Sequence, residues 1–259
     1  MDKKTAALKI VGALYPLITL GAVFAAWAIA AYAVDLPIVL PSVGDTFKGL
    51  GQLLGTAEFY VALGGTLLRT LIGFVTALVM ALALAVPAAF FKPLEKLLSP
   101  LVVIARAIPT MSVILLCLLW VSNRILPVVV SVFIVFPVLY TTVLSAIKGV
   151  DEGLKQMSAV YKVPRTRIAG RLYLPQIMPA LLTGVQTTLG LMVKLVIAGE
   201  VMSNTARSIG GSMNLAQQYL ETDMVLAYTL AAVVLSALLE GAAALIKRFT
   251  LRWEHGGDK

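Results

Sequence analysis

The chain has 259 residues, of which 59% are hydrophobic and only 13% are charged. This charged share is about half of that usual in soluble domains, so the composition excludes an ordinary soluble fold and a disordered chain. Six membrane spans of about 20 residues each would leave enough chain for loops, but not for a separate soluble catalytic domain. The net charge of +8 would fit nucleic-acid binding in a soluble protein, but the cytoplasmic loops of a membrane protein explain it better.

Cysteine and histidine are almost absent, since Cys117 and His255 are the only ones. No intrachain disulfide can form, and a cluster of Cys and His metal ligands cannot be built from one chain. We therefore expect no metal site. The N-terminal Met1-Asp2-Lys3-Lys4 leads into an apolar stretch without a small-residue cleavage site, which favours a retained anchor over a signal peptide.

Six long apolar runs predict an all-α, polytopic membrane protein. In chain order, the predicted spans cover residues 10–34, 59–89, 100–121, 125–147, 176–202 and 224–246. Helices are expected because backbone polar groups in lipid must be hydrogen-bonded within their own segment.

The distribution of lysine and arginine predicts the orientation. If the N-terminus is inside, 15 of the 21 cations fall in internal segments, 3 in external loops and 3 within spans. Cytoplasmic loops of membrane proteins collect Lys and Arg. We therefore expect a multi-pass protein of the plasma (bacterial inner) membrane with both termini in the cytoplasm, and no nucleic-acid partner.

The internal segment between the fourth and fifth spans, residues 148–174, is the most polar part of the chain. Lys148-Gly149 predicts the end of a helix, and Asp151-Glu152 predicts the start of another. From about Leu154 the spacing is helical, and Pro164 is expected to end this helix because it restricts the preceding residue and lacks an N–H.

This predicted helix is amphipathic. One face consists of Leu154, Met157, Val160 and Tyr161, and the other of Lys155, Ser158, Ala159 and Lys162. Such a helix could lie on anionic lipid or dock onto a cytoplasmic partner. The residues alone leave both readings open.

Several motifs resemble those of the permease subunits of binding-protein-dependent ABC importers, most closely the branch for nitrate, alkanesulfonates, taurine and pyrimidine or thiamine precursors. They are Leu40-Pro41-Ser42, residues 66–74, Arg106-Ala107-Ile108-Pro109, residues 174–184 and Ala198-Gly199-Glu200. The resemblance covers nearly the whole chain. It implies one permease domain over residues 1–259 with six transmembrane helices and a type I ABC importer fold.

In that family, the internal loop carries a Glu-Ala-Ala…Gly motif, with a Leu-Pro about a dozen residues after the glycine. Alignment on Leu174-Pro175 puts the glutamate at Gln156, the alanines at Met157 and Ser158, and the glycine at Lys162. The glutamate and the glycine are therefore both replaced. The resemblance implies that this segment couples to an ATPase. The implied coupling residues are Gln156, Met157, Ser158, Ala159, Tyr161, Lys162, Val163, Pro164 and Arg165.

The resemblance also implies partners. No G-x-x-x-x-G-K-[ST] motif occurs in the chain, so ATP and Mg²⁺ are expected on a separate ATPase, with no cofactor in this chain. The expected partners are an ATP-binding-cassette ATPase dimer, an extracytoplasmic substrate-binding protein, a second permease copy in a homodimer, and membrane lipid. The chain itself is expected to transport by alternating access and not to be an enzyme.

Two charged residues in the fifth span are candidates for the translocation path, because a charge in lipid is costly. Lys194 is a candidate pore cation for anionic substrates; alternatively it pairs with an acid such as Glu240 or extends towards the surface. Glu200, at the external end, is a candidate for the external gate or else an interfacial acid.

Two arginines also fall within spans. Arg106 lies one helical turn before Pro109, in an expected kink where it could pair with a freed carbonyl, and it is a further candidate for the path. We expect Arg69, in the second span, to have a structural role.

Two other functions stay open at this point. A secondary transporter or channel would need no ATPase, and the altered loop motif favours it while the amphipathic helix argues against it. An intramembrane enzyme would need a catalytic constellation, and none stands out. The substrate is open between an anion, such as a sulfonate or nitrate, and a neutral vitamin or precursor.

Overall fold

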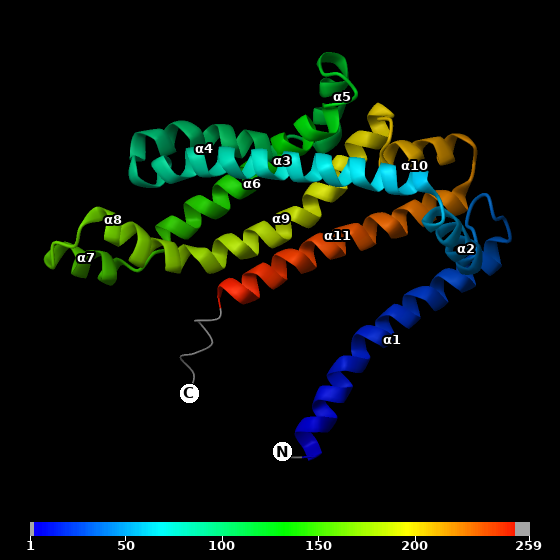
Figure 1. The fold of residues 1–259 in the computed structure, drawn as a ribbon, viewed down its shortest axis with the longest axis horizontal. Coiled ribbons are helices and arrows are strands. Elements are labelled where there is room, and N and C mark those ends of the chain that lie inside the picture. The colour runs from blue at the N-terminus through cyan, green and yellow to red at the C-terminus, as the bar shows by residue number, and fades with distance from the viewer. Residues whose placement is uncertain (1–2, 252–259) are drawn as a thin grey trace. The chain divides into compact units, whose positions relative to one another are not determined.

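The computed structural model describes the backbone of residues 3–251, and their side chains except those before Tyr15 and at positions 16 and 17. Every regular element in this range is a helix (Figure 1), which confirms the all-α prediction. The helices are α1 Lys3–Val34, α2 Val43–Leu54, α3 Ala57–Phe90, α4 Lys92–Ala107, α5 Thr110–Trp120, α6 Leu126–Lys148, α7 Glu152–Val160, α8 Arg165–Ile168, the π-helical η1 Ala169–Tyr173, α9 Leu174–Ser203, α10 Ile209–Gln218 and α11 Thr222–Thr250.

Among the described residues, four helical segments are long and apolar enough to cross a membrane. They are α3, α6, the segment Arg165–Ser203 that contains α9, and α11. These match the second, fourth, fifth and sixth predicted spans. The first predicted span lies in α1, whose apolar described part is Ile18–Val34. The multi-pass helical architecture is confirmed, and the count of six spans is approximate.

The third predicted span, residues 100–121, is bent at the kink expected near Pro109, and the bend is sharp. The helices α4 and α5 meet there at an angle of 96°. Pro109 has no N–H to continue the α4 hydrogen-bond ladder, and it restricts Ile108 to an extended conformation, with φ −69° and ψ 128°. The third predicted span is therefore a bent pair of helices.

The chain divides into two compact units. The first combines residues 1–59 with 213–231, and the second combines 60–212 with 232–259. The expectation of one permease domain over residues 1–259 stays a prediction.

In the first unit, hydrogen bonds fix the connection from α1 to α2. The Trp27 indole N–H donates to the Pro41 carbonyl at 3.2 Å. Ser42 caps α2, because its Oγ accepts from the Asp45 N–H at 3.1 Å and donates to the Asp45 carboxylate at 2.7 Å. This hydroxyl bond holds the pKa of Asp45 below its ordinary value. The Leu40-Pro41-Ser42 motif thus sets the start of α2.

The second unit has its core where α3, α6 and α9 pack together, with α6 and α9 side by side (Figure 1). Helix α3 contributes a row of fully buried alanines at four-residue spacing, Ala77, Ala81 and Ala85. Small residues on one helical face let helix backbones approach closely, which is the usual packing in membranes. Tyr140 and Met192 fill the space opposite from α6 and α9.

Two adjacent glycines in α3 offer a matched test of this packing. A Cβ at Gly65 would lie 2.2 Å from the carbonyl oxygen of Arg207, whereas a Cβ at Gly64 would meet no atom within 4 Å. We expect Gly65→Ala to lower the free energy of unfolding by about 1–3 kcal/mol through overpacking, and Gly64→Ala to raise it by up to about 1 kcal/mol.

Thermal unfolding of the two purified variants in detergent measures the difference. If Gly65→Ala is as stable as Gly64→Ala, the close approach of α3 to the Arg207 backbone is wrong.

Candidate functional site

The start of α7 is fixed by two acids. Asp151 caps the helix, and its Oδ1 accepts from the N–H of Leu154 at 2.9 Å. Glu152 follows and forms an ion pair with Lys155 at 3.1 Å. Acids at this end complement the helix dipole. The predicted helix start at Asp151-Glu152 is confirmed.

The end of α7 is a left-handed turn centred on Lys162. The Lys162 N–H donates to the Ala159 carbonyl at 3.1 Å, and the Val163 N–H donates to the Ser158 carbonyl at 3.0 Å. Lys162 itself has φ +49°, as expected for this helix ending. The prediction that Pro164 ends the helix is wrong, because this turn ends it at Val160 and Pro164 instead precedes α8.

The conformation of Lys162 supports the register of the loop motif. The family's glycine aligns with this position, and glycine is favoured where φ is positive because it has no Cβ. A residue with a Cβ costs about 1–2 kcal/mol in this conformation. The chain therefore has a left-handed backbone at the position where the aligned motif carries its glycine.

A continuous helical backbone leads from this turn into the fifth span. It runs for 39 residues, from Arg165 to Ser203. Within it, η1 forms one wider turn, in which the Leu174 N–H donates to the Ala169 carbonyl. This turn directly precedes Pro175, which cannot donate, and wide turns are a usual accommodation of such an interruption.

One side chain ties α7 to the fifth span. The Gln176 side-chain oxygen accepts from the Asp151 N–H at 3.0 Å. At the end of α6, Lys148 pairs with Glu95 of α4. The start of α7 is therefore joined to the fifth span, next to the point where the end of α6 is joined to α4.

A hollow of about 360 Å³ lies between α7 and the α8–η1 segment. It is lined by Leu154, Met157, Ser158, Tyr161, Val163, Arg167, Ile168, Arg171 and Leu172. Four of the nine predicted coupling residues, Met157, Ser158, Tyr161 and Val163, are among them. Ser158 thus lies on the same side as Leu154 and Met157, contrary to the face assignment from helical spacing. The other five, Gln156, Ala159, Lys162, Pro164 and Arg165, are exposed outside the hollow.

A second cluster surrounds Glu200, which is completely buried. Its carboxylate pairs with Arg69 of α3 at 3.0 Å and accepts from the Thr66 hydroxyl at 2.9 Å. It also accepts from the Gly210 N–H, at 3.2 Å. Glu200 is therefore a fully bonded interior acid rather than an exposed interfacial one.

The Glu200 cluster holds the first turn of α10. The Ile209 N–H donates to the Thr66 hydroxyl at 3.0 Å, and Arg69 donates to the Ala206 carbonyl at 3.3 Å. An acid at a helix N-terminus satisfies free N–H groups and complements the dipole. The structural role predicted for Arg69 is confirmed. Sequence reasoning missed its partner, although two opposite charges in otherwise apolar spans were a signal.

Lys194 is exposed, although Val193 and Leu195 on either side of it are buried. It belongs to an open stripe of α9 with helical spacing, together with Thr183 and Thr187. Among the described residues, Lys194 forms no ion pair with Glu240.

Glu240 instead accepts from the Ser236 hydroxyl at 3.2 Å and lies against Gly190, leaving no room for a Cβ there. Arg106 is exposed at the end of α4, and no hydrogen bond or ion pair joins it to a described residue. The pairing of Arg106 with a carbonyl freed at the Pro109 break is therefore not formed.

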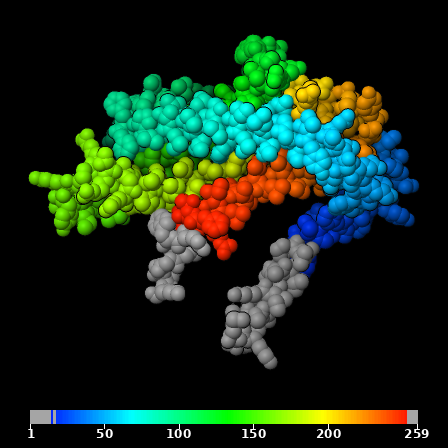
Figure 2. All heavy atoms as spheres, viewed as in Figure 1, coloured from blue at the N-terminus to red at the C-terminus, as the bar shows by residue number. Residues whose placement is uncertain are grey.

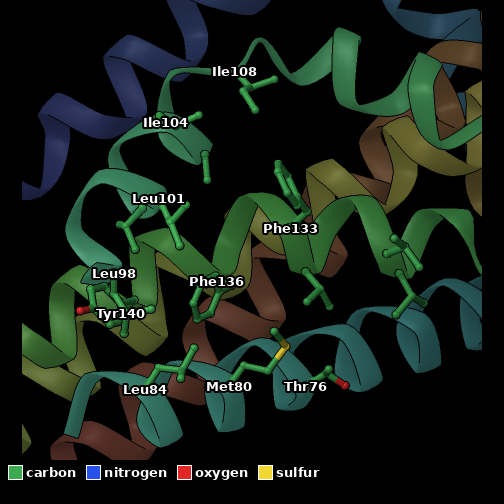
Figure 3. Close-up of a pocket in the computed structure, with 15 residues that line it drawn as sticks. Thr76, Met80, Leu84, Leu98, Leu101, Ile104, Ile108, Phe133, Phe136 and Tyr140 are labelled. Atoms are coloured by element: carbon green, nitrogen blue, oxygen red, sulfur yellow. The ribbon is translucent and has the colours of Figure 1, made fainter. Parts of the chain in front are cut away.

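A larger cavity of about 660 Å³ lies between α3, α4 and α6 (Figure 3). Thr76, Met80 and Leu84 line it from α3, and Phe133 and Phe136 from α6. Its walls are almost entirely apolar, and none of the predicted site residues line it. It offers room for an apolar group but no set of polar side chains for chemistry.

Long apolar helices joined by an anchored polar hairpin define a multi-pass helical membrane protein. A family model described as "Binding-protein-dependent transport system inner membrane component" matches residues 73–252. The chain belongs to this family, which confirms that it is an ABC importer permease, a transport subunit and not an enzyme.

Individual relatives agree with this assignment. The chain is 26% identical over 214 residues to an aliphatic sulfonates transport permease protein, SsuC, of Bacillus subtilis, covering 81% of this chain and 75% of the relative. It is 24% identical to the taurine transport system permease protein TauC of Escherichia coli, covering 86% and 84% of the two chains.

A solved structure shares the fold. It is the crystal structure of a bacterial ABC transporter involved in the import of the acidic polysaccharide alginate. The match has a TM-score of 0.65 at 16% sequence identity, and it covers 95% of this chain and 99% of that one. The type I ABC importer permease fold is thereby confirmed.

The Glu200 cluster generates a stability prediction. Glu200→Gln leaves the Arg69 charge without its acid, and breaking a buried pair costs about 3 kcal/mol or more. In the double variant Arg69→Met/Glu200→Gln, no charge is left unpaired and the amide oxygen can still accept from Gly210. We therefore expect the single variant to unfold at a lower temperature than the double variant.

Unfolding in detergent, followed by size-exclusion chromatography after heating, measures this order. Equal or higher stability of the single variant would contradict the buried ion pair as a structural contact.

Proposed function

We propose that this chain forms the translocation path of an ABC importer for small organic anions and works by alternating access driven by a separate ATPase. The observation that carries the proposal is the anchored α7 hairpin. It connects two membrane helices, it is fixed to the fifth span through Gln176, and its surface is exposed. A rigid element of this kind can pass a partner's motion to the spans as a rigid-body shift.

The coupling residues of this proposal are the nine predicted from the loop motif. The left-handed Lys162 supports their register. ATP and Mg²⁺ belong to the ATPase dimer, which binds this hairpin. Within the chain, Glu200 is part of the external gate at the opposite end of α9, where Arg69 holds it in place beside the first turn of α10. Arg106, exposed at the α4–α5 break, is a further path candidate.

The proposed substrate is a sulfonate, such as taurine or an alkanesulfonate. The names of the two permease relatives support it. The exposed Lys194 on α9 supports it independently, because a cation suits the oxygens of a sulfonate. Nitrate and neutral vitamin precursors are the competing substrates.

The assembly around the chain follows from the same proposal. A second copy forms a homodimer, since one permease type gives a symmetric pair. A substrate-binding protein docks outside. The protein is a multi-pass component of the bacterial inner membrane with both termini in the cytoplasm, as the 15 internal against 3 external cations support.

Reconstitution tests the proposed function. The permease is co-expressed with its ATP-binding-cassette ATPase and binding protein, placed in liposomes, and assayed with radiolabelled taurine and an alkanesulfonate. We expect uptake that requires ATP and ceases with a non-hydrolysable analogue. Uptake driven by an ion gradient without the ATPase would instead establish a secondary transporter.

Lys194 provides a test of the anionic substrate in the same assay. Because removal of one charge-assisted hydrogen bond costs at least about 1.4 kcal/mol, we expect Lys194→Met to reduce subsaturating sulfonate uptake about tenfold. Lys194→Arg is the matched control and should retain most uptake. Unchanged sulfonate uptake by Lys194→Met, in a complex that still assembles, would remove Lys194 from the path.

A further inference from the structure

The α7–α8 end of the second unit has a charge that its own residues do not neutralise. Lys162, Arg165, Arg167 and Arg171 are all exposed. Among the described residues, no ion pair or side-chain hydrogen bond involves any of these four. All four are accessible to a partner: Lys162 lies at the turn after α7, Arg167 and Arg171 lie at the open hollow between α7 and α8–η1, and Arg165 lies at a neighbouring hollow beside α3. Figure 2 shows this hairpin in yellow-green at one end of the unit.

The acids of the same segment are already engaged. Asp151 accepts from the Leu154 N–H at 2.9 Å, and Glu152 pairs with Lys155 at 3.1 Å. The position where the family motif carries its glutamate is Gln156, which is exposed and neutral. The outer surface around α7 thus offers an uncharged patch of Gln156, Ala159 and Val160, with the Glu152–Lys155 pair one turn before it and Lys162 after it.

An anionic lipid surface is the competing occupant for a basic amphipathic helix, and the length of the helix argues against it. The apolar run of the fifth span begins near Gln176, so Arg165 lies about 16 Å further along the helix axis. The headgroup layer is only about 6 Å thick on each side of the hydrocarbon core.

The side chains of α7 argue the same way. Leu154 and Met157 line the hollow against α8 and η1, so each directs part of its surface towards the hairpin, although 44% and 55% of their surfaces stay exposed. A helix that lies in the interface needs its large apolar side chains directed into the lipid. Val160, which is exposed outside the hollow, has a small side chain.

We propose that the α7–α8 hairpin binds a cleft on the ATPase partner that is apolar at its floor and acidic at its rim. This inference rests on the proposed function and adds the charge of the partner. The two motif replacements act together, because Gln156 removes an acid that such a rim would repel and Lys162 adds a cation that it attracts. The left-handed backbone at Lys162 is less favourable for lysine than for glycine, and the added positive charge offsets this cost when the partner binds.

The test puts back the family's glutamate at position 156 and its glycine at position 162, and measures whether each change weakens or strengthens binding to the ATPase. Full-length permease in nanodiscs of neutral phosphatidylcholine is titrated with the purified ATPase that supports uptake. We expect Gln156→Glu to weaken binding at least about fivefold, with Gln156→Met as the uncharged control. We also expect Lys162→Gly to weaken binding, although glycine suits the left-handed backbone and should stabilise the turn. Lys162→Arg is its charge-preserving control.

If opposite charges attract the two proteins, the ATPase must bind the permease more weakly when NaCl is raised from about 0.1 to about 0.5 M, because salt screens the attraction. Tighter binding by Gln156→Glu or Lys162→Gly, or insensitivity to salt, would overturn the acidic rim while leaving the importer function intact. Absence of binding by the wild-type chain would instead count against the proposed function. If protection of the hairpin from trypsin needs anionic lipid and not the ATPase, the occupant is the membrane.

Discussion

The need to hydrogen-bond every backbone group within a low-dielectric membrane governs this fold. Long stretches of α3, α6, α9 and α11 meet it with helical ladders, from which Pro87, Pro137 and Pro179 each remove one donor. The chain departs from the α-helical ladder at three further kinds of site. Pro109 turns the chain between α4 and α5, η1 widens one turn before Pro175, and left-handed residues at 162 and 204 close the ends of α7 and α9. The polar features of the molecule gather at these interruptions, because there the backbone itself supplies donors and acceptors.

Charge is handled in two opposite ways. At one end of α9, Glu200 is enclosed by Arg69, Thr66 and a backbone N–H, so that a costly buried acid becomes a fixed structural centre. At the other end, the cations of the α7–α8 hairpin are left without acids of their own chain. The first arrangement makes the structure rigid. In the second, the charges become stabilising only when a partner of opposite charge binds.

The sequence predicted those features that depend on interactions between residues close together in the chain. Hydrophobic runs predicted α3, α6, α9 and α11, and local acids predicted the start of α7, because these depend on neighbours within a few turns. The 96° bend was missed in its extent, although Pro109 marked its place. The Arg69–Glu200 pair joins residues 131 positions apart, and no local pattern encodes which spans pack together. The end of α7 was misplaced because the hydrogen bonds of a left-handed turn outweighed the expected effect of Pro164.

The unbroken helical backbone from Arg165 to Ser203 has a mechanical consequence. Its 39 residues correspond to a rod of about 58 Å at 1.5 Å per residue. One end of this segment carries the exposed arginines of α8. The other end carries Glu200, which accepts a hydrogen bond from the first turn of α10. A tilt of about 5° about one end would displace the other by about 5 Å, given that length. The segment is thus long enough to amplify a motion. A small change of angle at the hairpin displaces α10 by more than the length of a hydrogen bond.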